Sequence, residues 1–319
     1  MSVTVYAPAS IGNVGVGFDL LGAALAPIDG ELLGDCVAVS ERPAGLVFSC
    51  RGAWRHKLPS EPADNIVLQC AEYFVAQLPV ERRLPGLTIE LSKNLPVGSG
   101  LGSSASSVVA AFVALNEFFA RPFSANRLLL MMGEFEGRVS GSVHYDNVAP
   151  AFLGGMQFML QQAERVSEPM PFFDNWFWVI AYPGISISTA KMRALLPPQY
   201  DRAVVIEYGR NLGAFIHAVH ARNQQLAVSV LKDVMAEPYR SSSIPGYKEA
   251  RTALVDMGML AAGISGSGPT MFSITDDLQL AQRASQWLEQ NYLQNSEGFT
   301  RICRIDSSGA RLLSTNARK

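Results

Sequence analysis

Short segments in which hydrophobic and polar residues alternate occur along the whole chain and predict β-strands. A period of two is typical of a strand that buries one face. The strands expected from this alternation, or from short apolar runs between glycines and prolines, lie at residues 3–6, 35–40, 87–91, 156–160, 176–181 and 270–274. Residues 161–175 carry Pro169 and Pro171 and are expected to form a loop at a domain seam.

Longer apolar segments between these strands predict helices. The run that follows Ser103 is rich in Ala, Val, Leu and Phe, and Ser124 is a suitable N-cap for the next helix. The expected helices lie at residues 104–119, 124–138, 204–221, 225–235, 247–257 and 278–292. Strands and helices therefore interleave in mixed layers. Because 319 residues are too many for one compact core, we expect an α+β protein of two domains, residues 1–165 and 166–319, with a cleft between them.

Composition and charge exclude several classes of function. Hydrophobic residues make up 48% of the chain, which is enough for a folded core. The net charge is −2, and no block of like charges marks a surface for nucleic acid or membrane. No apolar segment approaches the roughly 20 residues of a membrane span, and the N-terminus has no secretory signal pattern. The four cysteines include no CxxC pair and are expected to be reduced, as in a cytoplasmic protein.

A glycine-rich segment, KNLPVGSGLGSSA at residues 93–105, lies between a predicted strand and a predicted helix. Gly98, Gly100 and Gly102 allow positive φ and a close approach of the backbone to a ligand. Successive amides and the following helix N-terminus would then attract a phosphate. Ser103 and Ser104 are expected to cap this helix, and one of them to be available to Mg²⁺. On glycine count alone, a plain turn with a serine cap explains the segment equally well.

Two better-known phosphate loops are excluded by the same segment. A Walker A loop needs a Gly-Lys pair, and the chain contains none. The dinucleotide pattern G-x-G-x-x-G fails because Ser103 stands where the third glycine would fall.

Two further loops of small residues follow or precede strands. Residues 7–19, APASIGNVGVGFD, display Asn13 and Asp19 among residues too small to form a core. Residues 263–270, GISGSGPT, precede the predicted strand at 270–274. Each loop taken alone is better explained as a turn, but three in one chain favour a shared binding site.

Together the three loops resemble the three motifs of the GHMP small-molecule kinases, in the correct order. The central P-x-G-x-G-L-G-S-S-A at residues 96–105 is the most specific of them. The resemblance spans essentially the whole chain. It implies an N-terminal domain with a left-handed β-α-β unit, a C-terminal ferredoxin-like domain, and the use of ATP with Mg²⁺. The left-handed connection departs from the usual right-handed rule and could not be derived from the pattern.

Within this superfamily the chain resembles the homoserine kinases. Residues 136–150, EGRVSGSVHYDNVAP, are similar to the segment that these kinases carry between the second and third motifs. The resemblance implies phosphorylation of the side-chain hydroxyl of L-homoserine in threonine biosynthesis, and it is compatible with a homodimer. Another GHMP kinase, acting on mevalonate, a sugar or shikimate, and a non-catalytic metabolite-binding relative stay open as alternatives.

The resemblance also implies roles for individual residues. Ser104 and Glu136 are the expected Mg²⁺ ligands, although Glu136 on its own would be taken for a solvated helix residue like Glu134. The residues expected to bind ATP are Asn65, Pro96, Val97, Gly98, Ser99, Gly100, Leu101, Gly102, Ser103, Ser104, Ala105 and Ser106. The residues expected to bind the substrate are Asn13, Asp19, His144, Asn147, Thr189, Arg193 and Arg240.

The catalytic residues implied by the resemblance are Asp19, Ser104, Glu136 and Asn147. Some relatives carry an aspartate at the position of Asn147, and an amide does not accept a proton usefully near neutral pH. Alignment and electrostatics are therefore expected to carry the reaction. The hydroxyl proton would go to the phosphate itself or to Asp19.

Overall fold

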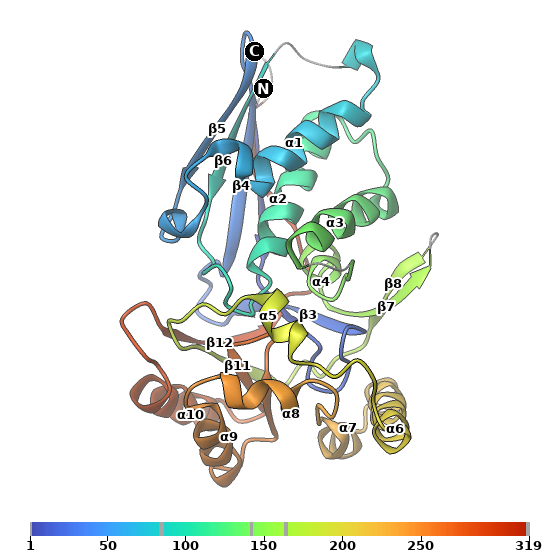
Figure 1. The fold of residues 1–319 in the computed structure, drawn as a ribbon, viewed down its shortest axis with the longest axis vertical. Helices are drawn as coiled ribbons and strands as arrows, with labels where there is room; N and C mark the ends of the chain where they lie inside the picture. The colour runs from blue at the N-terminus through green and yellow to red at the C-terminus, as the bar shows by residue number, and fades with distance from the viewer. Residues whose placement is uncertain (1, 83–85, 141–142, 163–164, 317–319) are drawn as a thin grey trace.

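The computed structural model describes residues 2–82, 86–140, 143–162 and 165–316, and its chain folds around two β-sheets (Figure 1). Gly141 and Ser142 of the segment 136–150 lie outside these residues. None of the helices in the described ranges is long and apolar enough to cross a membrane.

The first sheet has five strands in the order β13-β1-β4-β6-β5. Its strands are β1 (Ser2–Pro8), β4 (Gly34–Glu41), β5 (Gly45–Arg51), β6 (Gly86–Ser92) and β13 (Arg311–Asn316). Only β5 and β6 pair in parallel, and α1 (Ile66–Gln77) connects them. This is the β-α-β unit that the resemblance implied.

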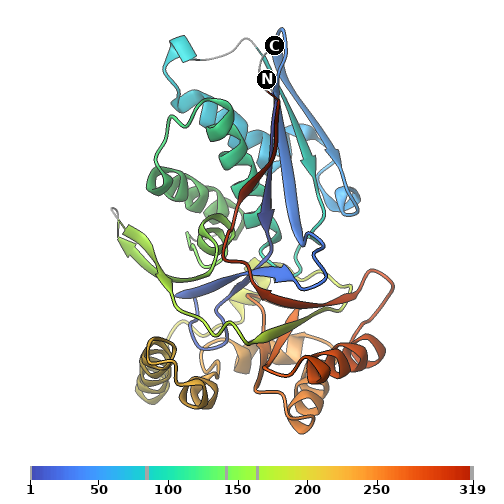
Figure 2. The ribbon, with the colours of Figure 1, turned by 180° about the vertical axis from the view of Figure 1, so that it is seen from behind.

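Four helices cover one face of the first sheet, as both views show (Figures 1 and 2). They are α1, α2 (Ser103–Phe118), α3 (Ala125–Ser140) and α4 (Val148–Leu153). The inward residues of the strands, such as Val5, Val37 and Ile89, form one core with Val109 and Phe112 of α2. Because α2 is packed on this core from end to end, its N-terminus is held in a defined place.

The second sheet has eight strands and lies below the first in Figure 1. Its path is β10-β11-β9-β12-β3-β7-β8, and the short β2 pairs with β3. The strands are β2 (Ser10–Gly12), β3 (Leu21–Pro27), β7 (Met156–Gln162), β8 (Arg165–Met170), β9 (Phe177–Tyr182), β10 (Ala261–Ile264), β11 (Met271–Thr275) and β12 (Phe299–Ile305).

The second sheet contains the ferredoxin-like unit that the resemblance implied. Strands β9, β10, β11 and β12 follow one another as β-α-β-β-α-β, and their spatial order places β9 between β12 and β11. The larger helices of this half are α6 (Arg202–His220), α7 (Gln224–Val230), α9 (Tyr247–Asp256) and α10 (Leu278–Asn291). They cover the face that points away from the first sheet (Figures 1 and 2). The mixed α+β prediction is thus confirmed.

The remaining helical elements of the described residues are short. The short α-helices are α5 (Thr189–Ala194) and α8 (Glu237–Arg240). Four 3₁₀ turns lie at Arg55–Lys57, Pro62–Asp64, Val80–Arg82 and Ser241–Ser243. Strands β3 and β7 belong to the second sheet, whereas β13 returns to the first, so each sheet draws on both ends of the chain. The division at residue 165 stays a prediction.

Two sequence predictions about local structure were wrong. The expected loop at 161–175 contains β8, which among the described residues pairs with β7 alone and places Pro169 opposite Gln157. Proline is tolerated there because β8 is an edge strand. The helix expected to reach residue 235 ends at Val230. The Asp233 carboxylate accepts hydrogen bonds from the amides of the segment 235–237 and so begins the next turn instead.

Candidate active site

The segment 96–104, called the glycine loop below, connects β6 to α2 where the two sheets meet. Its five consecutive carbonyls from Val97 to Leu101 each accept a hydrogen bond from another part of the chain. The donors are, in order, Ser186 Oγ (2.7 Å), the Ile187 amide (2.9 Å), the Thr270 amide (3.0 Å), Ser265 Oγ (2.6 Å) and the Ser10 amide (3.1 Å). In a planar trans peptide the amide points opposite to the carbonyl. The amides of these peptides therefore point away from the five donors, and the Leu101 amide donates to Ser99 Oγ (3.3 Å).

Glycine is required in this loop at two close contacts. Gly100 has a φ of +84°, and a Cβ there would lie 2.5 Å from the Ser265 carbonyl oxygen. Gly102 has a φ of +63°, and a Cβ there would lie 2.2 Å from Ser10 Oγ. Both the conformation and the space exclude a side chain. The loops that carry Ser10 and Ser265 thus lie directly against the glycine loop.

The N-terminus of α2 has no side-chain cap. Its N-cap residue is Gly102, and the prediction that Ser103 or Ser104 caps the helix is wrong. Ser103 instead donates its hydroxyl to the carbonyl of Leu95 (3.2 Å). The first amides of a helix have no intrahelical acceptor. Here they are left available for a ligand, and the helix dipole favours an anion.

A buried ion pair lies behind the glycine loop and was not predicted from the sequence. Lys93 and Asp35 are both almost completely inaccessible, and the Lys93 ammonium donates a hydrogen bond to the Asp35 carboxylate. Asp35 also accepts the amides of Asn94 (2.7 Å) and Leu95 (2.9 Å), while Lys93 donates to the carbonyl of Ser103 (2.9 Å). The pair therefore fixes both ends of the loop. The available signal was that Asp35 begins the predicted strand 35–40 and that Lys93 follows the predicted strand 87–91 by two residues.

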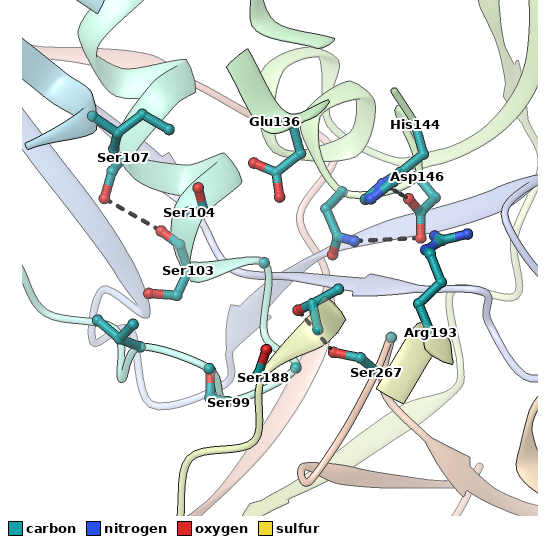
Figure 3. A pocket seen from close by; sticks show the side chains of 18 of the residues that line it. Ser99, Ser103, Ser104, Ser107, Glu136, His144, Asp146, Ser188, Arg193 and Ser267 are labelled. Atoms are coloured by element: carbon teal, nitrogen blue, oxygen red, sulfur yellow. Dashed lines mark hydrogen bonds and ion pairs between the residues drawn. The ribbon is translucent and has the colours of Figure 1, made fainter. Parts of the chain in front are cut away.

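Ser104 from α2 and Glu136 from α3 point into the same part of the cavity (Figure 3). Glu136 is buried, whereas Glu134 is exposed and accepts a hydrogen bond from Tyr73. Burial raises the pKa of Glu136, and the His144 imidazole and the Ser104 hydroxyl act in the opposite direction. A hydroxyl and a carboxylate are hard oxygen donors, and Mg²⁺ keeps several waters when it binds proteins. This donor set fits Mg²⁺.

Asp19 and Arg193 form a bidentate ion pair across 174 positions of the sequence. The two guanidinium nitrogens donate to the two carboxylate oxygens at 2.8 and 2.9 Å. The hydrogen bonds to Asp19 raise the pKa of Arg193 more than its partial burial lowers it. Both residues were predicted to contact the substrate, and the structure brings them together with each other.

Arg240 lies beside this pair but is held by main-chain groups. It is buried, and it donates to the carbonyls of Gly266 (2.9 Å) and Met192 (3.3 Å). Burial lowers its pKa. The guanidinium carbons of Arg193 and Arg240 lie 5.8 and 5.4 Å from the ring centroid of Phe18. One aromatic ring therefore supports both cations.

The side chains of Asn13 and Thr189 contact the third loop. Asn13 donates its amide nitrogen to the Gly266 carbonyl (3.2 Å), and its oxygen accepts the Asp19 amide (3.0 Å). The Thr189 and Ser267 hydroxyls lie 3.1 Å apart. These contacts position Asp19 relative to α5 and to the third loop.

Asp146, which the sequence reasoning did not single out, joins His144 to Asn147. One carboxylate oxygen lies 2.9 Å from His144 Nδ1, and the other accepts the Asn147 amide nitrogen at 3.3 Å (Figure 3). The Asn147 oxygen accepts the Ser10 hydroxyl (3.0 Å), so both ends of this amide are oriented. Burial lowers the pKa of His144, but the carboxylates of Asp146 and Glu136 outweigh it and the pKa is raised.

One cavity of about 390 Å³ connects these groups. Asn65 lines it and also caps α1 by accepting the Val67 amide (3.0 Å). The other predicted residues that line it are Asn13, Asp19, Val97, Gly98, Ser99, Gly100, Gly102, Ser103, Ser104, Glu136, His144, Asn147, Thr189, Arg193 and Arg240.

Four residues predicted to bind ATP are absent from the described lining of this cavity: Pro96, Leu101, Ala105 and Ser106. Ala105 packs in the core between the first sheet and its helices, and Leu101 packs in a core with residues of the second sheet such as Leu21 and Ile180. Ser106 donates its hydroxyl to the Ala7 carbonyl (2.7 Å). The structure thus gives their side chains packing and positioning contacts.

The chain is similar to proteins of known structure over almost its whole length. A homoserine kinase from Cytophaga hutchinsonii is 29% identical, with 98% of this chain and 97% of that chain covered and a TM-score of 0.88. A Listeria monocytogenes protein described as a homoserine kinase is 20% identical, with 98% and 100% covered and a TM-score of 0.71. A mevalonate kinase from L. major, in complex with R-mevalonate, is 16% identical, with 95% and 96% covered and a TM-score of 0.69. The last two show the fold alone.

Two family descriptions match the chain in the expected order. "GHMP kinases N terminal domain" matches residues 65–155, and "GHMP kinases C terminal" matches residues 211–293. Together they cover more than half of the chain and include the glycine loop and Glu136. GHMP kinases are ATP-dependent enzymes that commonly use Mg²⁺. With its three loops gathered at one cavity, the chain is a member of the GHMP kinase family.

Proposed function

We propose that this kinase transfers the γ-phosphoryl group of ATP to the side-chain hydroxyl of L-homoserine, giving O-phospho-L-homoserine and ADP in cytoplasmic threonine biosynthesis. The observation that carries the proposal is that one cavity contains a phosphate-binding loop and a cluster of two arginines and an aspartate. The similarity to a homoserine kinase over nearly the full chain supports the same substrate.

The proposed substrate matches the charges at the acceptor end of the cavity. Homoserine carries a carboxylate, an ammonium and a hydroxyl. The planar guanidinium groups of Arg193 and Arg240 suit the carboxylate, and Asp19 suits the ammonium. His144 and Asn147 then lie toward the hydroxyl. An acceptor without an ammonium would offer Asp19 no counter-charge in place of Arg193.

At the phosphate end, main-chain amides provide most of the proposed contacts. The amides of the glycine loop and of the first turn of α2 would bind the triphosphate. Ser104 and Glu136 would hold Mg²⁺, which neutralises phosphate charge when bound. Phosphoryl transfer asks little covalent chemistry of a protein, so orientation and charge are sufficient.

The proton of the acceptor hydroxyl has no dedicated base in this proposal. Asn147 is an amide, and its nitrogen donates a hydrogen bond to Asp146. Both oxygens of Asp19 accept hydrogen bonds from Arg193. The proton then leaves with the transferred phosphoryl group. If Asp19→Asn lowers kcat about a thousandfold while the KM for homoserine hardly changes, Asp19 is the base instead.

An ADP-release assay with several acceptors tests the proposal. Purified protein is given MgATP and equal concentrations of L-homoserine, R-mevalonate, D-galactose or shikimate, and the phosphorylated product is identified by mass spectrometry. We expect homoserine to be preferred by at least about 100-fold in kcat/KM, because a site built for polar groups rejects ligands that lack them.

Glu136→Gln and Glu134→Gln are matched variants two positions apart on one helix. We expect Glu136→Gln to lower kcat by roughly 10²–10³. Glu134→Gln changes an exposed residue and is expected to stay within about twofold. A folded preparation that binds ATP but shows no homoserine-dependent turnover would overturn the proposal.

A further inference from the structure

We propose that the Asp19–Arg193 ion pair makes substrate binding conditional on a ligand that carries both an ammonium and a carboxylate. This inference rests on the proposed function and concerns how the same site selects its acceptor. In the structure the two groups assigned to the two ends of homoserine are bound to each other. A ligand that binds both groups therefore competes with this ion pair.

The geometry of the pair leaves little of either group for a ligand. Both terminal nitrogens of Arg193 and both oxygens of Asp19 are engaged, at 2.8 and 2.9 Å. Arg193 Nε is buried and has no hydrogen-bond partner among the described residues. Each terminal nitrogen of Arg193 keeps one further N–H. A carboxylate arriving at Arg193 thus cannot use the two terminal nitrogens as an end-on fork until Asp19 has left them.

The pair is nevertheless accessible. The side chains of Arg193 and Asp19 are 27% and 29% exposed, and both line the cavity. A partly solvated pair is weak enough for a charged ligand to replace. Separation is favourable, however, only if both partners find new counter-charges, because an unpaired charge in a partly buried site is costly.

Arg240 provides the contrast within the same cluster. Its two recorded hydrogen bonds go to main-chain carbonyls, and within the described part of the chain it forms no ion pair. It is buried and lies against Phe18, so it is a fixed cation. Arg240 is available to any carboxylate, whereas the end-on fork of Arg193 becomes available only when an ammonium occupies Asp19.

Ligands with only one charge are therefore disfavoured, whichever charge they carry. A carboxylate without an ammonium frees Arg193 only by leaving Asp19 unpaired, and an ammonium without a carboxylate leaves Arg193 unpaired. A zwitterion with both groups on one carbon replaces one ion pair by two. Removing Asp19 should then improve binding of a ligand that has only the carboxylate.

Asp19→Asn is a suitable variant because the backbone at this position is retained. Asp19 has a φ of +57°, a conformation that asparagine tolerates well. Its amide is bound by Asn13, which the substitution does not touch. Asp201→Asn is the control, since Asp201 is exposed at the start of α6 and its side chain caps nothing there.

Binding is measured by titration calorimetry without nucleotide, so that no reaction occurs. The ligands are L-homoserine, 4-hydroxybutyrate, which lacks the ammonium, and 3-aminopropan-1-ol, which lacks the carboxylate. In the unmodified protein and in Asp201→Asn, homoserine is expected to bind at least about tenfold more tightly than either analogue. Asp19→Asn is expected to weaken homoserine about tenfold and to strengthen 4-hydroxybutyrate about fivefold.

The expected gain in 4-hydroxybutyrate binding by Asp19→Asn is the result that tests the inference. If Asp19→Asn leaves 4-hydroxybutyrate binding unchanged or weakens it, the inference is wrong, even when homoserine is phosphorylated normally. If the gain is seen but homoserine is never phosphorylated, the proposed function is wrong and the role of the pair stands. Arg193→Met is a second variant in case Asp19→Asn does not fold. It should strengthen 3-aminopropan-1-ol by a similar factor, and a loss there would contradict the inference equally.

Discussion

The two ends of the cavity are built in different ways. The main-chain amides of the phosphate end come from one continuous segment, 93–104. Its carbonyls from Val97 to Leu101 accept hydrogen bonds from other parts of the chain, and its ends are fixed by a buried ion pair. The acceptor end is assembled from five separate parts of the chain, and its central ion pair is partly exposed.

This difference follows from what each end must bind. A triphosphate has the same shape for every kinase that uses ATP, so a rigid arrangement of amides is sufficient. An acceptor must be distinguished from similar metabolites, which favours side chains whose charges can be exchanged. Rigidity at one end and exchangeable contacts at the other can be tested separately.

The largest effect is expected from removing the buried charge behind the glycine loop. Lys93→Met leaves Asp35 buried without its cation and should lower the free energy of unfolding by about 3–5 kcal/mol. Urea denaturation followed by circular dichroism measures this change. The control is Lys232→Met, whose exposed pair with Glu207 is worth less than about 1 kcal/mol. Equal losses in the two variants would show that the buried pair is not special.

A smaller effect is expected from closing the space at Gly100. Gly100→Ala adds a Cβ 2.5 Å from the Ser265 carbonyl at a φ of +84°. We expect a loss of roughly 1–3 kcal/mol in stability and a rise of at least about tenfold in the KM for ATP, with the KM for the acceptor little changed. Steady-state kinetics with each substrate varied in turn separates the two KM values.

Gly209→Ala is the matched control for Gly100→Ala. Gly209 lies within α6, and a Cβ there meets nothing within 4 Å. Because alanine is the better helix former, this change should stabilise the protein by about 0.5–1 kcal/mol. If Gly100→Ala behaved like Gly209→Ala, the close contact between the second and third loops would be wrong.

The two ends also differ in how far the sequence predicts them. The glycine loop was found because its conformation depends on local residues that tolerate positive φ. Even there the helix cap was assigned wrongly, because the Ser103 hydroxyl donates its hydrogen bond to the Leu95 carbonyl instead. The pairing of Asp19 with Arg193, 174 positions apart, leaves no local trace. In the sequence alone, Asp146 and Asp35 cannot be distinguished from surface aspartates, because their neighbours in space are not known.

Asp146 is expected to affect the chemical step rather than nucleotide binding. In Asp146→Asn the new amide can still accept from His144 but would place a donor against the Asn147 amide nitrogen. We expect kcat to fall by about 10–100-fold while the KM for ATP stays within about twofold. Asp29→Asn, at an exposed position, is the control. A parallel rise in the KM for ATP would place Asp146 at the phosphate end instead.

The smallest effect concerns the response of the two ion pairs to salt. A double-mutant cycle with Asp19→Asn and Arg193→Met should give a coupling of about 0.5–1 kcal/mol in unfolding free energy at low salt, since both side chains are partly exposed. Near 1 M salt, where the Debye length is about 3 Å, the coupling should fall by more than about half. The cost of Lys93→Met should hardly change over the same range, because salt does not reach a buried pair. A coupling at Asp19 that resists salt as Lys93 does would mean that the acceptor end is as rigid as the phosphate end, and that its charges are not free to exchange with a substrate.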